Sequence, residues 1–153
     1  MSDLKPILLV EDNPKDIELT LAALEQAQLA NTVVVARDGA EALDYLYSRG
    51  QYAGRNTAPP AVVLLDLKMP KVDGLEVLEQ IKSDPHFRHT PVVMLTSSRE
   101  ERDLVKSYSL GVNAFVVKPV GFEQFFEAIR DLGMFWAVLN EPPPSSSNRA
   151  LKV

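Results

Sequence analysis

Polar side chains follow four apolar runs of this sequence, at the point where each run ends. These residues are Glu11, Asp12, Asp66, Thr96 and Lys118. The runs are short and rich in β-branched residues, as is typical of strands buried on both faces. Because parallel strands place their carboxyl ends along one edge of a sheet, we expect these side chains to share a shallow pocket. Three carboxylates, a hydroxyl and an ammonium suit a divalent metal ion and a phosphoryl group.

The carboxylates of Glu11, Asp12 and Asp66 would repel one another at such an edge. Crowding of this kind raises carboxyl pKa values unless a cation lies between the groups, and Mg²⁺ prefers oxygen ligands. The alternative is that Asp12 and Asp66 cap the helices that follow them. One acid alone does not separate the two interpretations, but Thr96 and Lys118 at the matching strand ends favour the metal site.

Asp66 is the best candidate for a nucleophilic carboxylate, because it ends the expected central strand and has no acidic neighbour. An aspartyl phosphate is a mixed anhydride, so its formation requires the charge on the phosphoryl oxygens to be neutralised. Mg²⁺ would bind one oxygen, Lys118 another, and the Thr96 hydroxyl or nearby backbone N–H groups a third. Ser97 and Ser98 are alternatives to Thr96. A surface position is the alternative for Lys118, but the apolar residues before it favour the pocket.

Strand and helix signals alternate along the chain, which predicts helices covering a parallel sheet. The expected strands span residues 7–10, 32–36, 62–66, 92–95 and 114–117. The expected helices are one starting near Pro14, one opened by Asp38 and Gly39, one containing Leu75, Leu78 and Ile81, one at 100–110, and one from about 122 to 140.

The chain of 153 residues predicts one domain over residues 1–140. Residues 48–60 are rich in glycine and proline and predict a loop longer than usual for such folds. Residues 141–153 contain runs of proline and serine, and we expect them to be disordered.

Composition excludes several classes of function. The net charge of −5 and the absence of a basic stripe disfavour nucleic-acid binding. No apolar run approaches the ~20 residues needed to cross a bilayer, and residues 1–6 do not resemble a signal peptide. The chain has no cysteine, which excludes disulfides and thiolate metal sites, and we expect a cytoplasmic protein.

Taken together, these residues resemble the receiver domain of response regulators in two-component signalling. The resemblance covers residues 5 to about 140 and rests on Glu11-Asp12, Asp66 followed by Leu-Lys-Met-Pro and Asp73-Gly74, Thr96-Ser97, and Lys118-Pro119. It implies a flavodoxin-like α/β fold, a doubly wound (βα)₅ unit with a five-stranded parallel sheet. It also implies that Asp66 accepts a phosphoryl group from a phosphohistidine of a sensor histidine kinase.

The same resemblance assigns the remaining site residues. It implies that Asp12, Asp66 and the backbone carbonyl of Lys68 bind Mg²⁺, with Glu11 assisting through water. Lys118 matches the phosphate-binding lysine of the family, whose Lys-Pro peptide bond is commonly cis.

Thr96 and Phe115 match the hydroxyl and aromatic pair that switches the surface of helix 4, strand 5 and helix 5. Phe115 stands where many members carry tyrosine, so burial of the ring must serve without a phenolic hydroxyl.

The loop at 48–60, the long aromatic last helix and the stand-alone architecture are similar to the regulators that partner phytochrome-type histidine kinases. On the last helix, one apolar stripe is expected to face the sheet: Phe122, Phe125, Ile129, Leu132 and Trp136. Further apolar residues do not all fit on it: Phe126, Phe135, Val138 and Leu139. This surplus predicts a homodimer through the region of Phe122, Phe126, Phe135 and Trp136, the alternative being a broad core face.

Other functions fit the residues less well. An aspartate-nucleophile phosphohydrolase would usually have a second acid where Lys68 stands, so we expect no turnover of a substrate. A flavodoxin-like cofactor module would need a glycine-rich loop after the first strand, where Asn13 and Pro14 stand instead. A degenerate receiver that only dimerises is a further alternative. His86 and His89 have a spacing that could ligate a metal, but their polar turn predicts solvent exposure, away from the pocket.

Overall fold

The computed structural model describes residues 5–55, 58–69, 72–98, 100–101 and 111–131. Its strands form one parallel sheet in the order β2-β1-β3-β4-β5. Their bounds are β1 (Ile7–Val10), β2 (Val33–Ala36), β3 (Val62–Asp66), β4 (Val92–Thr96) and β5 (Ala114–Val117). The predicted five-stranded parallel sheet is confirmed, and β3 is its central strand.

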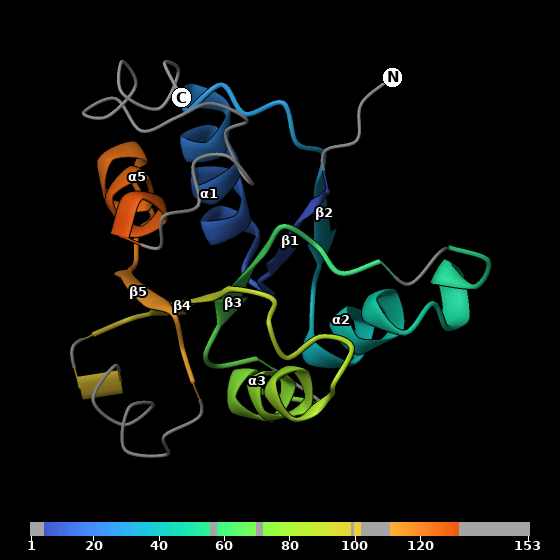
Figure 1. Ribbon diagram of the computed structural model, residues 1–153. Coiled ribbons are helices and arrows are strands. Elements are labelled where there is room, and N and C mark those ends of the chain that lie inside the picture. The colour runs from blue at the N-terminus through green and yellow to red at the C-terminus, as the bar shows by residue number, and fades with distance from the viewer. Residues whose placement is uncertain (1–4, 56–57, 70–71, 99, 102–110, 132–153) are drawn as a thin grey trace, which may run out of the picture.

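Helices cover both faces of this sheet (Figure 1). Figure 1 shows α1 (Pro14–Gln26) and α5 (Phe122–Asp131) on one face, and α2 (Gly39–Leu46) and α3 (Gly74–Ser83) on the other. Successive strand residues point to opposite faces, which divides the buried residues into two cores. Leu9 and Leu64 belong to the core beneath α1 and α5, whereas Leu8 and Leu65 belong to the core beneath α2 and α3.

The helices after β1 and β3 begin on residues other than the site acids. The Asn13 side chain caps α1, because its Oδ1 accepts from the N–H groups of Lys15 (2.9 Å) and Asp16 (3.0 Å). Asp73 caps α3 in a reciprocal capping box with Glu76. The capping interpretation of Asp12 and Asp66 is therefore wrong, and both carboxylates remain available to the site.

The described part of the predicted long loop at 48–60 packs onto α2. It contains a short 3₁₀ turn, Gly50–Tyr52, and the Tyr52 hydroxyl donates to Glu41 Oε2 at 2.8 Å. The Arg55 guanidinium lies 3.8 Å from the centre of the Tyr45 ring, and its Nε donates to the Tyr45 carbonyl at 2.9 Å. These contacts attach the described part of the loop to α2.

The turn before β4 supplies a core residue that its polar neighbours do not suggest. Phe87 is 1% exposed, and its ring lies edge-on to Tyr47 at 5.4 Å. His86 and His89 are exposed, as their sequence context predicts.

Parts of two predicted helical regions lie outside the described residues. Only residues 100–101 of the helix expected at 100–110 are described, and they are helical. The last helix is described to Asp131, so Phe135, Trp136 and the tail at 141–153 fall outside that part of the chain. Within the described ranges, no helix has the length and apolar character needed to span a membrane.

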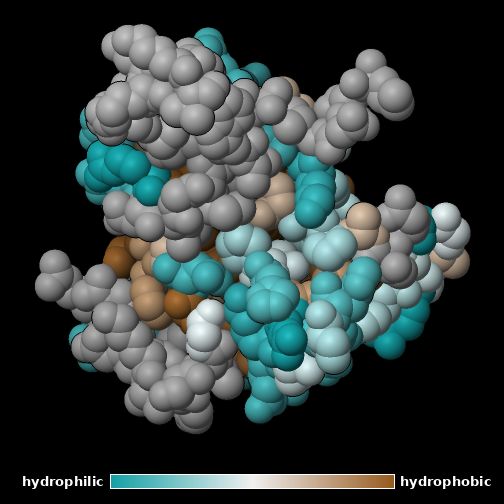
Figure 2. Space-filling view, viewed as in Figure 1, coloured by the Kyte–Doolittle hydropathy of each residue, from teal (hydrophilic) through white to brown (hydrophobic). Residues whose placement is uncertain are grey.

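Hydrophilic residues cover α2 and α3 on the face shown in Figure 2. Hydrophobic residues show in the same view where β5 lies. This agrees with the partial burial of Ala114, Phe115 and Val117 in that strand. Among the described residues β5 pairs only with β4, so it forms an edge of the described sheet.

Gly74, the first residue of α3, packs directly against the backbone that carries Asp66. A Cβ atom at position 74 would lie 2.2 Å from the Asp66 carbonyl oxygen and 2.8 Å from Leu67 Cα. Backbone atoms cannot rotate away, so Gly74→Ala is expected to lower the free energy of unfolding by about 1–3 kcal/mol. Urea unfolding would measure the change. Glu79→Ala, at an exposed position of α3, is the control and is expected to have little effect.

Candidate functional site

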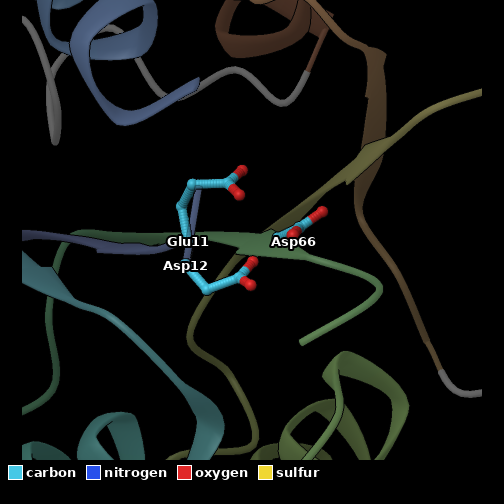
Figure 3. A group of neighbouring side chains, drawn as sticks. All are labelled: Glu11, Asp12 and Asp66. Carbon is cyan, nitrogen blue, oxygen red and sulfur yellow. The ribbon is translucent and has the colours of Figure 1, made fainter. Parts of the chain in front are cut away.

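Three carboxylates converge at the carboxyl ends of β1 and β3. Glu11 and Asp12 follow β1, and Asp66 is the last residue of β3. One oxygen from each of the three side chains lies within 4.8 Å of the others, and Figure 3 shows the carboxylates turned toward a common space. Glu11 and Asp66 are buried, at 0% and 3% exposure, whereas Asp12 is exposed. Asp12 is therefore the member of the cluster that solvent reaches most readily.

Lys118 reaches this cluster from the end of β5. Its ammonium lies 3.1 Å from Asp66 Oδ1, 3.3 Å from Glu11 Oε1 and 3.0 Å from Asp16 Oδ2. The Lys118 N–H donates to the Thr96 carbonyl at 2.7 Å, which ties the end of β5 to the end of β4, and the Lys118–Pro119 bond is cis. The predicted pocket position of Lys118 is confirmed.

Thr96 ends β4 with a buried hydroxyl that has no hydrogen-bond partner among the described residues. The register pairs Asp66 with Leu95 and Thr96 with Val117, which places Thr96 between the strands of Asp66 and Lys118. A buried hydroxyl without a partner is unfavourable, and an oxygen of a bound anion would satisfy it.

The charges of the site are unbalanced in the absence of a cation. Burial raises the pKa of Glu11 to about 7, and the nearby charge of Asp66 adds to the effect. Burial also raises the pKa of Asp66, against the opposing attraction of Lys118. Burial lowers the pKa of Lys118, but its hydrogen bond to Asp16 and the charge of Asp66 raise it by more, so Lys118 stays protonated. An oxygen-preferring divalent cation at the three acids would relieve this excess of negative charge, so the residues fit a metal site.

This electrostatic state predicts a pH-dependent stability. Between pH 4.5, the pKa of Glu11 in the unfolded chain, and its folded pKa of about 7, Glu11 is protonated in the folded state and ionised in the unfolded state. Without metal, the free energy of unfolding is therefore expected to fall as pH rises through this window, by up to about 1.4 kcal/mol per unit. Urea unfolding at pH 4.5–8 in EDTA would measure it. Glu11→Gln is expected to flatten most of the slope, and an equal slope in that variant would contradict the assignment.

A second group of charges bridges the loops that follow β3 and β4. Glu101 Oε1 accepts from the Ser97 N–H at 2.7 Å, and its Oε2 lies 3.1 Å from the Lys68 ammonium. Burial alone would raise the pKa of Glu101, but the Ser97 N–H and Lys68 outweigh it, and the net shift is downward. Glu101 is therefore an ionised carboxylate beside the site.

The sequence indicated most of these residues and missed two. Asp16 and Glu101 each contact a predicted site residue. Asp16 resembles an ordinary acid of a first helical turn. For Glu101 there was a signal, because Ser98-x-x-Glu101 is a capping-box pattern. Phe115, the predicted switch residue, is partly buried against the core beneath α2 and α3.

Residues 7–130 match the family model of the response regulator receiver domain. Response regulator Rcp1 from Synechocystis sp. is 38% identical over 86% of this chain and 88% of its own length. Among solved structures, the bacteriophytochrome response regulator AtBRR is 73% identical with a TM-score of 0.85, covering 92% of this chain and 100% of that one.

A second bacteriophytochrome response regulator, RtBRR, is 64% identical with a TM-score of 0.85, covering 97% of this chain and 89% of that one. Rcp1 has also been solved in its Mn(2+)-bound form, which is 36% identical to this chain with a TM-score of 0.70, over 91% of this chain and 99% of that one.

Proposed function

Because this chain belongs to the response regulator receiver domain family, we propose that Asp66 accepts a phosphoryl group from a sensor histidine kinase in a Mg²⁺-dependent reaction. The observation that carries the proposal is the Lys118 ammonium, 3.1 Å from Asp66 Oδ1 beside the acidic cluster. The unpartnered Thr96 hydroxyl supports it, because it offers a further donor at the same edge.

The proposed step uses residues of the pocket in distinct roles. An Asp66 carboxylate oxygen attacks phosphorus, and the bond between phosphorus and the histidine nitrogen of the kinase breaks. The electron pair of that bond stays on the imidazole nitrogen, and the product is a mixed anhydride on Asp66. Lys118 and Thr96 donate to phosphoryl oxygens and stabilise the charge that collects there.

The metal ion would be held by Asp12, Asp66 and the Lys68 backbone carbonyl, with Glu11 assisting through water. When bound, it supplies positive charge that offsets repulsion between the carboxylate nucleophile and the incoming phosphoryl group. Rcp1 has been solved with Mn²⁺, and its likeness to this chain supports a divalent ion here. Mg²⁺ is proposed because it binds carboxylates while keeping several waters.

The readout is a change of surface rather than turnover of a substrate. Phosphorylation adds about −1.5 to −2 charges, and it shifts an existing equilibrium toward the state that binds this charge better. Thr96 and Phe115 would carry the change to the surface around β5 and α5.

We propose that the partner is a phytochrome-type histidine kinase, supported by the likeness to two bacteriophytochrome response regulators. We also propose that this chain is cytoplasmic.

Homodimerisation through the last helix is a further proposal. On the described part of that helix, the rings of Phe122 and Phe126 lie 5.2 Å apart, and Phe126 also packs partly against the core. The proposed domain is residues 1–140, with the loop at 48–60 and a tail at 141–153.

Intact-mass spectrometry after incubation with acetyl phosphate tests the central claim. A single phosphate-sized increase is expected in Mg²⁺ and none in EDTA. Absence of the adduct on folded protein, also in rapid-quench samples, would instead support a degenerate receiver that acts only through interactions.

A further inference from the structure

Glu101 holds two groups that an anion on Asp66 would otherwise attract. Ser97 follows Thr96 at the end of β4, and its N–H points to the Glu101 carboxylate at 2.7 Å. Lys68 lies two residues beyond Asp66, and its ammonium contacts the other carboxylate oxygen at 3.1 Å. The Glu101 carboxylate thus links the loop that follows Asp66 at the end of β3 to the loop that follows Thr96 at the end of β4.

The Glu101 carboxylate is mostly buried, with 14% of the side chain exposed, and it stays ionised. It also lies within electrostatic reach of Lys118, which favours its charged form. It therefore resembles a phosphoryl group in two respects, because it carries negative charge beside the pocket and accepts hydrogen bonds from donors at the strand ends. A phosphoryl group on Asp66 would meet repulsion from this charge, and it would find the Ser97 N–H and the Lys68 ammonium already bound to Glu101.

We propose that Glu101 is an internal competitor of the phosphoryl group, which holds Ser97 and Lys68 in the unphosphorylated state and must release them when Asp66 is phosphorylated. The proposal rests on the proposed phosphoacceptor function of Asp66. It makes Glu101 a positioning residue, since it acts through the donors it binds.

Release of Glu101 would also couple the pocket to the helical residues 100–101. The Glu101 N–H donates to Ser98 Oγ at 3.3 Å, so its backbone is tied to the loop after β4 as well. When the carboxylate leaves the Ser97 N–H, residues 100–101 lose a contact that holds them beside the site.

Beryllofluoride with Mg²⁺ is a suitable probe, because it occupies the position of a phosphoryl group on a carboxylate without transferring one. Its affinity would be measured by titration calorimetry on the full chain, for wild type, Glu101→Gln and Glu101→Ala. Glu100→Gln is the matched control, because it removes the same charge from the adjacent, exposed residue.

Loss of a competing charged hydrogen bond is expected to raise beryllofluoride affinity roughly tenfold in Glu101→Gln. The effect should be larger in Glu101→Ala, which lacks any acceptor, and absent in Glu100→Gln. Glu101→Gln should also lower the unfolding temperature without the probe and increase the stabilisation that the probe gives.

The opposite results overturn the proposal in separate ways. If Glu101 only caps a helix, Glu101→Gln lowers the unfolding temperature equally with and without the probe, and affinity does not rise. That result leaves the function of Asp66 intact, provided wild type binds beryllofluoride and forms the acetyl phosphate adduct. If wild type does neither, the proposed function and the role of Glu101 both fail. Should Glu101→Ala not fold, Glu101→Gln decides the question alone.

Discussion

Asp66→Asn is expected to abolish the phosphate-sized mass increase that the wild-type chain gains from acetyl phosphate and Mg²⁺. An amide oxygen is a poor nucleophile. Glu11 is also buried and contacts Lys118, but it follows β1, whereas Asp66 ends the central strand. We expect the loss to be complete within the detection limit of intact-mass spectrometry. An adduct of unchanged yield in this variant would place the chemistry at another residue.

The variant is also expected to remain folded, which makes its failure interpretable. The substitution preserves side-chain volume, and it removes a charge that opposes ionisation of Glu11. Lys118 keeps Glu11 and Asp16 as partners. Asp12→Asn is the matched comparison, because it removes a proposed metal ligand and leaves the nucleophile. Its adduct should form slowly at low Mg²⁺ and recover as Mg²⁺ is raised.

Lys118→Met is expected to destabilise the metal-free protein strongly and to do so more at high pH. The Lys118 side chain is 14% exposed, and its ammonium lies within 3.3 Å of three carboxylates. Removing one partner of a buried ion pair typically costs about 3–5 kcal/mol. Without Lys118 the pKa values of Glu11 and Asp66 rise further above their unfolded values, so stability falls as pH rises from about 5 to 8. Urea unfolding at several pH values would measure this.

Mg²⁺ should restore part of the stability lost in Lys118→Met, because a cation at the acids replaces the missing charge. Lys82→Met provides the control. Lys82 is also partly buried, but it donates to the Thr90 carbonyl at 2.8 Å and to Asn113 Oδ1 at 3.1 Å rather than to carboxylates. Its removal should weaken the fold with little dependence on pH between 5 and 8 and no recovery with Mg²⁺. Identical behaviour of the two variants would contradict the electrostatic account of the site.

The sheet and most of the candidate site could be predicted because both follow from local pattern. A short β-branched run that ends in a polar residue defines a strand and the position of its last side chain at the same time. Once the strands are parallel, Asp66, Thr96 and Lys118 must share an edge, whatever the helices do. The order of strands then places β3 at the centre.

Asp16 could not be predicted, because it lies within α1 and not at a strand end, so the strand pattern does not place it beside Lys118. Its place in the first turn of α1 already has a local explanation in the helix dipole. The sequence also left open that Asp12 and Asp66 cap helices, because an acid that follows a strand is a reasonable helix cap. The structure decides it through neighbours, because Asn13 and Asp73 occupy the capping positions.

Phe87 shows a second reason why a buried residue can escape prediction from the sequence. It lies in a polar turn, so it belongs to no apolar periodicity, yet its ring is among the largest fully buried side chains. The Tyr47 ring against it and the hydrogen bond from Tyr47 to Asp84 bring that turn against the end of α2. Burial here depends on the packing of two segments far apart in sequence, which a pattern along one segment does not contain.

The position of β5 at an edge of the described sheet divides the site into parts of unequal local stability. Glu11 and Asp12 follow β1 and Asp66 ends β3, and both of these strands pair on two sides. Lys118 follows β5, which among the described residues pairs with β4 alone. Backbone amides of β5 should therefore exchange with deuterium faster than those of β1 and β3. Each opening of β5 withdraws the ammonium and leaves the acidic cluster in place. A metal ion alone would then protect the central amides, and an anion that also binds Lys118 would extend that protection to the edge.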